Sequence, residues 1–345
     1  MWIKWRERVH KSPWIAKGSE EGEIVEDLAE YMAYCSAYLG NKDSTIMGKL
    51  VAVKFYHQQF QNMSLPLSNP YIKGVAQGIK RGHVEKGTQA RVRRPLTWGM
   101  LSSMQQSVGG EGAGGRVLWI GLALTYLLML RASELFAERD GKIHDVYCLC
   151  RGDVAFFEGD EQLEGSERVR ANKIEVHMRG SKGDQGRKGA VLVREKARAN
   201  GAVELMLELF GIYGSEGLSA KTPLMVHKRG GKWEVWQRGK ATEQLRKGIR
   251  AVAEEWVKEG RGAGAKLRPE EFALHSGRIG GATRLAAKGV PGAVIKKEGR
   301  WSSDAFLVYV RANMQDPAWV SAVLEEGGGL FERQPGQGTK WGKKT

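Results

Sequence analysis

The longest apolar run of the chain, VLWIGLALTYLLML, spans residues 117–130 and is followed at once by Arg131. A helix that crosses a membrane needs about 20 consecutive apolar residues. This shorter run therefore predicts a helix that is buried in the core of a globular domain and ends near Arg131. A chain of 345 residues is long enough for two domains and at least one sizeable core. We expect a core around this helix and no membrane as a partner.

The charge balance indicates a polyanionic partner. Lys and Arg number 54 against 39 Asp and Glu, a net charge of +15, and such an excess most often serves nucleic-acid binding. The three cysteines, Cys35, Cys148 and Cys150, include no C-x-x-C pair, which argues against a disulfide framework and a zinc site. The N-terminal stretch lacks the continuous apolar segment of a secretory signal. We therefore expect an intracellular protein in a reducing compartment.

Helical periodicity dominates the first quarter of the chain. Ile24, Leu28, Met32 and Cys35 recur at spacings of four, four and three residues, which is the pattern of an amphipathic helix. Further helical patterns follow it. Residues 18–84 are therefore predicted to form a small, all-helical module.

A basic stretch, residues 85–95, follows this module. A solvated linker is the usual interpretation of such a charge run. The alternative is a linker that lies along a DNA backbone, where arginine neutralises phosphates and releases counterions. The candidate DNA-binding residues in and before this stretch are Lys80, Arg81, Arg91, Arg93 and Arg94.

The region over residues 96–326 combines helices with a small β-sheet. Ile174, Val176 and Met178 alternate with polar residues, as in a half-buried strand. A glycine-rich turn follows, and the sequence AVLV starts a return strand. We expect a mainly α-helical protein with a small antiparallel β-sheet, followed by a flexible basic tail over residues 327–345.

An ordered set of polar and aromatic residues lies in the last third of the chain. His275 and Arg278 are three residues apart, so on a helix they share one face and reach one ligand. Trp301 comes shortly after Gly299, and the serine pair after it is the expected N-cap of a last helix that carries Tyr309. Each residue alone is most often structural, whereas the ordered set is far less common by chance.

Two further candidates lie upstream of this set. Arg131 stands at the end of the apolar run, where a partly buried arginine needs an anionic partner. Glu134 is the partner that a purely structural interpretation assigns to it. Lys182 lies in the turn between the two predicted strands, where a lysine is usually only solvated.

The segments LRASEL, GSKGDQGRKG, HSGRIGGATRLAAKGV and GRWSSDAFLVYVR, in this order, resemble the catalytic domain of the tyrosine recombinases. The last segment is most similar to the transposon-borne eukaryotic and viral branch, such as the Crypton and DIRS-type recombinases. The resemblance implies a core-binding domain for the helical module and a catalytic domain over residues 96–326. It assigns the first catalytic arginine to Arg131, the β-hairpin lysine to Lys182, the His-x-x-Arg pair to His275 and Arg278, the His-or-Trp position to Trp301 and the nucleophile to Tyr309.

The resemblance implies a reaction that suits these residue types. Tyr309 would attack a DNA phosphodiester and form a covalent 3′-phosphotyrosyl link, which conserves the bond energy for rejoining. Two arginines match the charge that grows on the non-bridging oxygens. His275 and the indole of Trp301 would add donors, or His275 would accept the tyrosine proton. Lys182 would protonate the leaving 5′ oxygen. No metal, ATP or other cofactor is implied.

Two features depart from the pattern of the family. Trp301 and Tyr309 are 8 positions apart, one fewer than in many bacterial members, and one residue is about 100° of helix rotation. The transposon-borne branch shares this shorter spacing. Ile279 stands where many members carry a second basic residue, and Lys188 is an alternative to Lys182 on the same hairpin.

The leading hypothesis is a site-specific DNA recombinase of the integrase or transposase type that acts as a homo-tetramer on two double-stranded DNA sites. The first alternative is a catalytically silent DNA-binding protein with the same fold. The second is an enzyme like a type IB topoisomerase, which relaxes a single duplex as a monomer. The compartment is expected to be the nucleus in a eukaryotic host, or the cytoplasm and nucleoid in a bacterial one.

Overall fold

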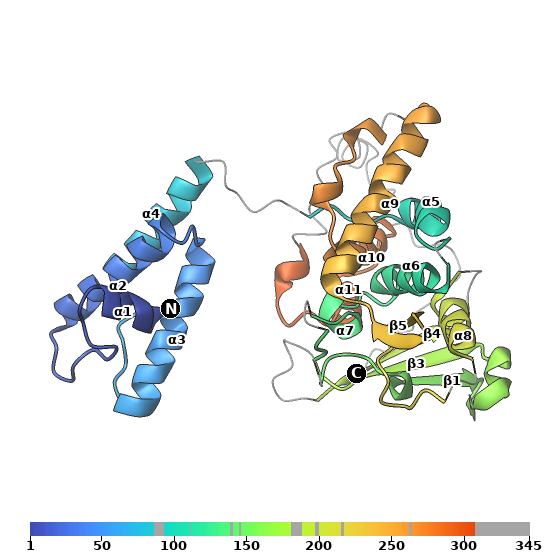
Figure 1. Ribbon diagram of the computed structural model, residues 1–345, viewed down its shortest axis with the longest axis horizontal. Helices are drawn as coiled ribbons and strands as arrows, with labels where there is room; N and C mark the ends of the chain where they lie inside the picture. Colours follow the sequence, from blue (N-terminus) through green and yellow to red (C-terminus); the bar gives the residue numbers. More distant parts are fainter. Residues whose placement is uncertain are drawn as a thin grey trace, which may run out of the picture. The chain divides into compact units, whose positions relative to one another are not determined.

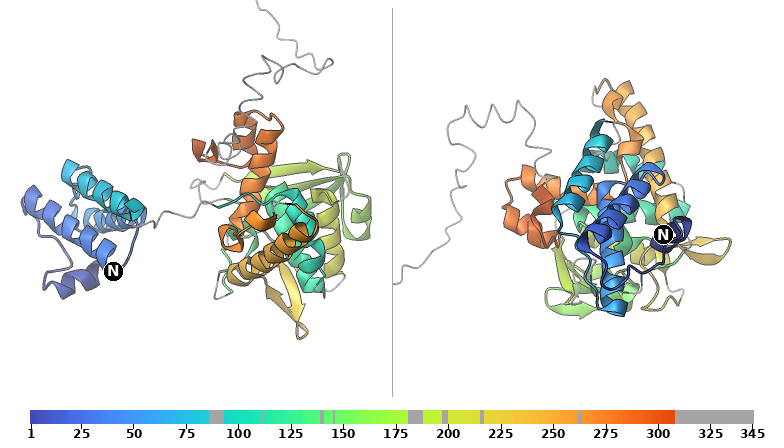
Figure 2. Two further views of the ribbon diagram at one scale, coloured as in Figure 1. Left: turned by 90° about the horizontal axis from the view of Figure 1, so that it is seen from above. Right: turned by 90° about the vertical axis from the view of Figure 1, so that its left-hand side faces the viewer.

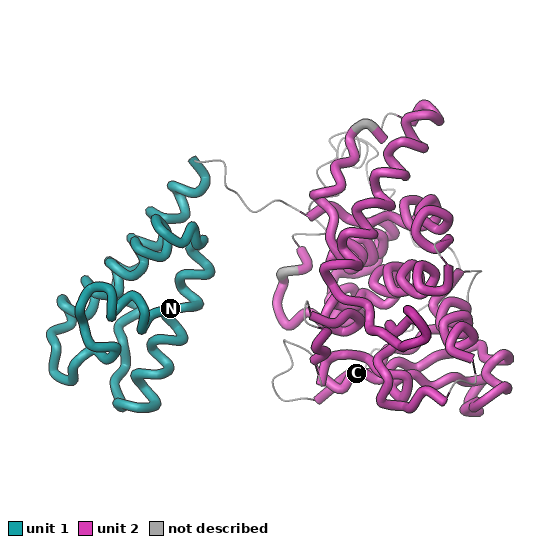
Figure 3. Tube along the Cα trace, viewed as in Figure 1, with its two compact units in different colours: residues 1–91 teal, residues 92–345 magenta. Residues whose placement is uncertain are grey.

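The computed structural model divides the chain into two compact units, Met1–Arg91 and Val92–Thr345 (Figure 3). The side chains of residues 265 and 305 are not described. The residues that the structure describes are 1–85, 93–110, 112–138, 141–144, 146–180, 188–196, 200–214, 217–261 and 264–307.

The first unit is all-helical. Its helices are α1 (Trp2–Arg8), α2 (Glu21–Ala37), α3 (Asp43–Gln61) and α4 (Pro70–Glu85). Their apolar stripes meet in one core, and its fully buried members include Leu28, Met32, Ile46, Leu50 and Ile72.

The N-terminal stretch belongs to this same core, although the expected module begins only at residue 18. Trp2 and Trp5 are buried and pack against Tyr31 of α2. The Asp27 carboxylate forms ion pairs with the guanidinium of Arg6 and the ammonium of Lys11. The charges scattered among the tryptophans conceal the helical pattern of this stretch in the sequence.

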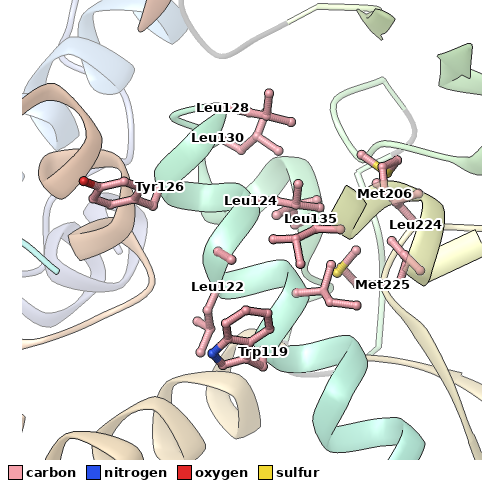
Figure 4. Packing of buried hydrophobic residues seen from close by; sticks show 14 of the residues in the cluster. Trp119, Leu122, Leu124, Tyr126, Leu128, Leu130, Leu135, Met206, Leu224 and Met225 are labelled. Carbon is pink, nitrogen blue, oxygen red and sulfur yellow. The ribbon is translucent and has the colours of Figure 1, made fainter. Parts of the chain in front are cut away.

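The second unit is built around α6 (Gly112–Leu127). Every residue of α6 from Val117 to Tyr126 is buried. Figure 4 shows the side chains of Trp119, Leu122 and Leu124 in this core. The helices that pack directly on it are α5 (Trp98–Ser107), α8 (Ala202–Tyr213) and α10 (His275–Ala287), and α9 (Arg238–Lys258) packs against α5. The buried core helix expected from the apolar run is thus present.

The end of α6 differs from the expectation. The helix ends at Leu127, three residues before the apolar run does. Met129 has a φ of 47°, in the left-handed region, so residues 128–130 form a tight bend whose leucines stay buried. The short helix α7 (Ala132–Leu135) follows. Because of this bend, the Met129 carbonyl is released from the helix and becomes available to another part of the chain.

A four-stranded antiparallel sheet with the order β2-β1-β3-β4 lies at one end of the second unit (Figure 1). In the hairpin of β3 and β4, Val176 lies opposite Leu192. Ile174, Val176 and Met178 are all buried, which confirms the predicted alternation. The strands are β1 (Val154–Glu158), β2 (Glu161–Leu163), β3 (Lys173–Met178) and β4 (Ala190–Glu195).

Helix α8 covers this sheet, and Phe210 meets Phe156 of β1 edge to face. A second hairpin, β5 (Val226–Arg229) with β6 (Lys232–Val235), projects from the unit in both views of Figure 2. The remaining elements are α11 (Gly292–Glu298) and the short 3-10 helices at Arg151–Asp153, Gly165–Arg170, Gly264–Lys266, Pro269–Glu271 and Asp304–Phe306.

Glycines bring α10 unusually close to α6. A Cβ added at Gly277 would overlap the Thr125 side chain, and one at Gly280 would overlap the Leu96 carbonyl. Where two segments lie this close together, only a glycine fits. The approach fixes the first turn of α10 against the end of α6, where His275 and Arg278 lie.

Candidate functional site

Arg131 and Glu134 form an ion pair at the start of α7. The Glu134 side chain is only 1% exposed, and its Oε1 accepts a hydrogen bond of 3.0 Å from Arg131 Nη1. Its Oε2 accepts a second one, 2.7 Å long, from the Arg131 backbone N–H. The partner that the structural interpretation assigned to Arg131 is therefore present. About a fifth of the Arg131 side chain stays exposed, so the pair does not remove this guanidinium from solvent.

Arg278 is anchored from two sides. It is almost fully buried, and its Nη1 donates to the Met129 carbonyl over 2.7 Å. Its Nη2 donates to the Gly299 carbonyl. The guanidinium lies over the Trp301 ring, 4.3 Å from the centroid, in cation–π geometry. The bend after α6 and the turn after α11 thus hold one arginine of α10 between them.

His275 is close enough to both arginines for their charges to act on it. Burial, and then the positive charges of Arg278 and Arg131, lower the pKa of His275 to about 4. The imidazole is therefore neutral near pH 7, with one nitrogen that donates and one that accepts. In the free protein this imidazole is therefore an uncharged but weak base.

Trp301 lies in the turn that follows α11. Its backbone N–H donates to the Lys296 carbonyl over 3.0 Å, and its ring packs against Phe306 at 5.9 Å between centroids. Trp301 and Phe306 belong to a small apolar cluster that also contains Met129. This cluster joins the two turns that hold Arg278. The tryptophan therefore supports the arginine through its ring face.

Several predicted residues lie outside the part of the chain that the structure describes. They are Tyr309, Lys182 and Arg91, together with the tail. The same holds for most of the expected last helix, of which the structure describes a 3-10 turn at Asp304–Phe306. Lys188, the alternative hairpin lysine, is described and exposed, two residues before β4.

One residue of the site was missed by the sequence analysis. Arg300, directly before Trp301, donates from Nη2 to Glu134 Oε2 over 2.7 Å, and its side chain is only 9% exposed. Burial lowers the pKa of Arg300, and the Glu134 carboxylate opposes this effect. The available signal was an arginine inside an otherwise apolar or small-residue turn. Nothing in that pattern distinguishes a buried arginine from a solvated one.

The candidate DNA-binding residues divide between the two units. Lys80 and Arg81 are exposed on α4. Arg93 Nη1 donates to the Glu270 carbonyl, and Arg94 Nη1 donates to that of Lys266. The end of the basic stretch, which belongs to the second unit, is therefore held by hydrogen bonds within that unit.

The charges of this site do not balance. Arg131, Arg278 and Arg300 contribute three positive charges, and Glu134 contributes one negative charge. The neighbouring Arg194 is paired with Glu298 at 2.8 Å. With His275 neutral, the cluster carries a net positive charge of about two, which favours an anionic ligand. Within the described ranges, no group of three or more His, Cys, Asp and Glu side chains is placed to hold a metal ion, and no helix is long and apolar enough to cross a membrane.

Comparison with known proteins places the fold. No protein-family model matches this chain, and no curated protein matches it. Among solved structures, the XerH site-specific recombinase in a post-cleavage complex with its difH substrate superposes with a TM-score of 0.54 at 14% identity, over 94% of this chain and 77% of XerH. The Tn1549 transposon integrase with right-end DNA gives a TM-score of 0.49 at 14% identity, over 92% of this chain and 91% of the integrase.

The likeness to XerH concerns the fold alone, because the identity is low. The XerA recombinase superposes more weakly, with a TM-score of 0.42 at 10% identity over 94% of this chain and 87% of XerA. The mainly helical architecture with a small antiparallel sheet, expected from the resemblance to the tyrosine recombinases, is confirmed. The chain therefore has the fold of a site-specific recombinase.

Proposed function

We propose that this protein is a site-specific DNA recombinase that cuts and rejoins DNA through a phosphotyrosyl intermediate at Tyr309. One observation carries the proposal. Arg131, the α10 pair His275 and Arg278, and Trp301 come from three separate segments of the chain, and in this fold they gather in one positively charged cluster. Packing alone does not require two guanidinium groups, an imidazole and an indole to converge in this way.

The proposed reaction uses the residues of this cluster. The Tyr309 hydroxyl attacks phosphorus, the new O–P bond forms, and the bond to the 5′ oxygen breaks. His275, neutral near pH 7 because of its lowered pKa, accepts the tyrosine proton. Lys182, or Lys188 on the same hairpin, gives a proton to the 5′ oxygen. The exchange of one phosphodiester for another needs no ATP.

The two arginines stabilise the transition state. As phosphorus becomes five-coordinate, a second negative charge develops on its non-bridging oxygens. Arg131 and Arg278 are held by carbonyl and carboxylate acceptors before any substrate arrives, so little reorganisation is needed when this charge appears. Removal of one such preorganised donor typically lowers a rate about 10²–10³-fold.

The remaining features of the proposal concern partners and setting. The partner is double-stranded DNA, supported by the net charge of +15 and by the exposed basic residues Lys80 and Arg81 of the helical core-binding module. Arg91, Arg93 and Arg94 would add phosphate contacts. Assembly as a homo-tetramer on two DNA sites, membership in the transposon-borne branch and an intracellular location belong to the same proposal.

Covalent capture tests this function. The full-length protein is incubated with nicked duplexes, including sequences that flank its own gene, and then denatured. The linked peptide is mapped by mass spectrometry. We expect an adduct on the Tyr309 peptide that is absent in Tyr309→Phe and kept in Tyr71→Phe, a control at an exposed tyrosine of α4.

Each other outcome of the capture selects a different function. Salt-sensitive binding without an adduct on any DNA would identify a silent DNA-binding protein and reject catalysis. An adduct that forms on every duplex, together with relaxation of supercoils by the monomer, would identify a topoisomerase. An adduct on another tyrosine would show that the nucleophile is misassigned.

A further inference from the structure

One turn of the chain accepts hydrogen bonds from both candidate catalytic arginines. The Gly299 carbonyl accepts from Arg278 Nη2, and the next carbonyl, that of Arg300, accepts from Arg131 Nη2 over 3.2 Å. Two consecutive peptide groups therefore set the relative position of two guanidinium groups. The backbone of this turn must be fixed if the arginines are to stay in register.

The side chain of Arg300 closes this arrangement into a ring. It leaves the turn and donates to Glu134 Oε2, while Glu134 Oε1 binds Arg131. Arg131 in turn binds the backbone of Arg300. Each member of this ring of three residues is thus held by the other two. The Glu134 carboxylate is shared between two guanidinium groups, so it neutralises neither of them alone.

The conformation and burial of Arg300 are unfavourable by themselves. Its φ of 55° is in the left-handed region that residues with a side chain rarely adopt. Two of its guanidinium nitrogens, Nε and Nη1, are buried and have no hydrogen-bond partner among the residues that the structure describes. A buried charge with incomplete partners is destabilising, and an apolar side chain of similar volume is often tolerated better. Such residues are concentrated at functional sites.

We propose that Arg300 is a positioning residue, which fixes the turn Gly299–Arg300 and the Glu134 carboxylate so that Arg131 and Arg278 present their guanidinium groups to one phosphate. The inference rests on the proposed function of these two arginines and adds a residue that acts through them. Arg300 is assigned a role through these two arginines because its Nη2 is bound to the Glu134 carboxylate and its backbone carbonyl accepts from Arg131.

The sharing of Glu134 gives the physical reason. If Arg300 is absent, one carboxylate faces only Arg131, and a bidentate Arg–carboxylate pair becomes available. That pair would occupy the donors that Arg131 otherwise offers to phosphate. With Arg300 present, one carboxylate oxygen is engaged by another guanidinium. Arg131 then keeps part of its hydrogen-bonding capacity for the substrate.

The test compares Arg300→Met and Arg300→Lys with the wild type in the full chain. The first readout is the single-turnover rate of adduct formation on a nicked duplex, measured together with DNA affinity. For Arg300→Met we expect a loss on the order of 100-fold in rate, DNA affinity within about 3-fold of the wild type since phosphate contacts remain, and an unchanged or higher melting temperature. Arg300→Lys keeps a positive charge beside the Glu134 carboxylate, so this variant should retain about a tenth of the wild-type rate.

Arg116→Met is the matched control. This arginine forms an ion pair with Glu208 in the same unit, and it lies over the ring of Trp119. Its loss should lower the melting temperature and leave the rate per folded molecule unchanged. Wild-type rates in both Arg300 variants would overturn the inference. Failure of both Arg300 variants to fold would also overturn it, because Arg300 would then be a structural residue.

A second readout separates this inference from the proposed function. Inorganic phosphate is added to the protein without DNA, and the rise in melting temperature is recorded. We expect a rise in the wild type and in Arg116→Met, and a smaller one in Arg300→Met. If the wild type forms no adduct on any DNA, the proposed function fails, yet this readout still reports on Arg300. Equal rises in all three proteins would reject the positioning role.

Discussion

Glu134 is the residue whose replacement tests the charge balance of the site most directly. Glu134→Gln keeps the shape and one acceptor oxygen but removes the negative charge that pairs with both Arg131 and Arg300. The Glu134 side chain is 1% exposed, and its two partners are 21% and 9% exposed. Breaking a buried pair by removal of one partner costs about 3–5 kcal/mol, because an uncompensated charge is left behind.

That cost is measurable in this protein. The total stability of a domain is roughly 5–15 kcal/mol. In a unit of this size each kcal/mol lowers the melting temperature by about 2–4 °C. We therefore expect a fall of roughly 10 °C for the second unit in Glu134→Gln. The assay is thermal and urea unfolding of the full chain, followed by circular dichroism and tryptophan fluorescence so that the two units are resolved.

Two comparisons make the argument refutable. Glu208→Gln removes a carboxylate from a more exposed pair, 21% and 37% for the two side chains, and should cost no more than ~1 kcal/mol. The double variant Glu134→Gln with Arg300→Met should be more stable than the sum of the single effects by roughly 1–3 kcal/mol. If Glu134→Gln lies within ~1 kcal/mol of the wild type, or if the effects add, then the buried charge balance described above is wrong.

Three further predictions concern packing and pH. Gly280→Ala should lower the free energy of unfolding by ~1–3 kcal/mol, because the added methyl group forces α10 away from Leu96. Gly48→Ala on α3, where the space around the glycine is open, should leave that free energy unchanged or raise it. The urea midpoints of the two variants check both expectations. The pKa of His275 is lowered to about 4 in the folded protein, so as the pH falls the unfolded chain binds a proton before the folded chain does. The free energy of unfolding should therefore decrease as the pH falls from ~6.5 to 4. His275→Gln should flatten that slope. Trp2→Ala should lower the free energy of unfolding of the first unit by about 3–5 kcal/mol. The first unit should then unfold at a lower temperature, which near-UV circular dichroism would detect.

Local patterns predicted the elements that depend on one periodicity. The strand with buried Ile174 and Val176 was predicted because alternation and burial coincide. The core helix was predicted as an element, but its end was not. The bend at Met129 depends on Arg278, which is distant in sequence and binds the Met129 carbonyl.

The candidate site was predictable only as far as the resemblance extends. The sequence placed Arg131 and Glu134 together because they are three residues apart, and the structure confirms that pair. It did not reveal Arg300, because pairing with Glu134 joins segments 166 positions apart. Tertiary ion pairs of this kind have no periodicity and no local signature. The catalytic roles of Tyr309 and Lys182 stay predictions, since both lie outside the described residues.

Burial lowers the pKa of His275 most, and the same arginines that would bind phosphate lower it further. Their positive charges contribute to the lowered pKa of this imidazole. An anionic phosphate bound between Arg131 and Arg278 would offset those charges, which acts to raise the pKa of His275 when the substrate is present. A higher pKa makes the imidazole a stronger base in the complex, while in the free protein it stays uncharged near pH 7. In the proposed reaction, substrate binding itself therefore prepares His275 to accept the proton of Tyr309, and this coupling requires that both guanidinium groups remain in place.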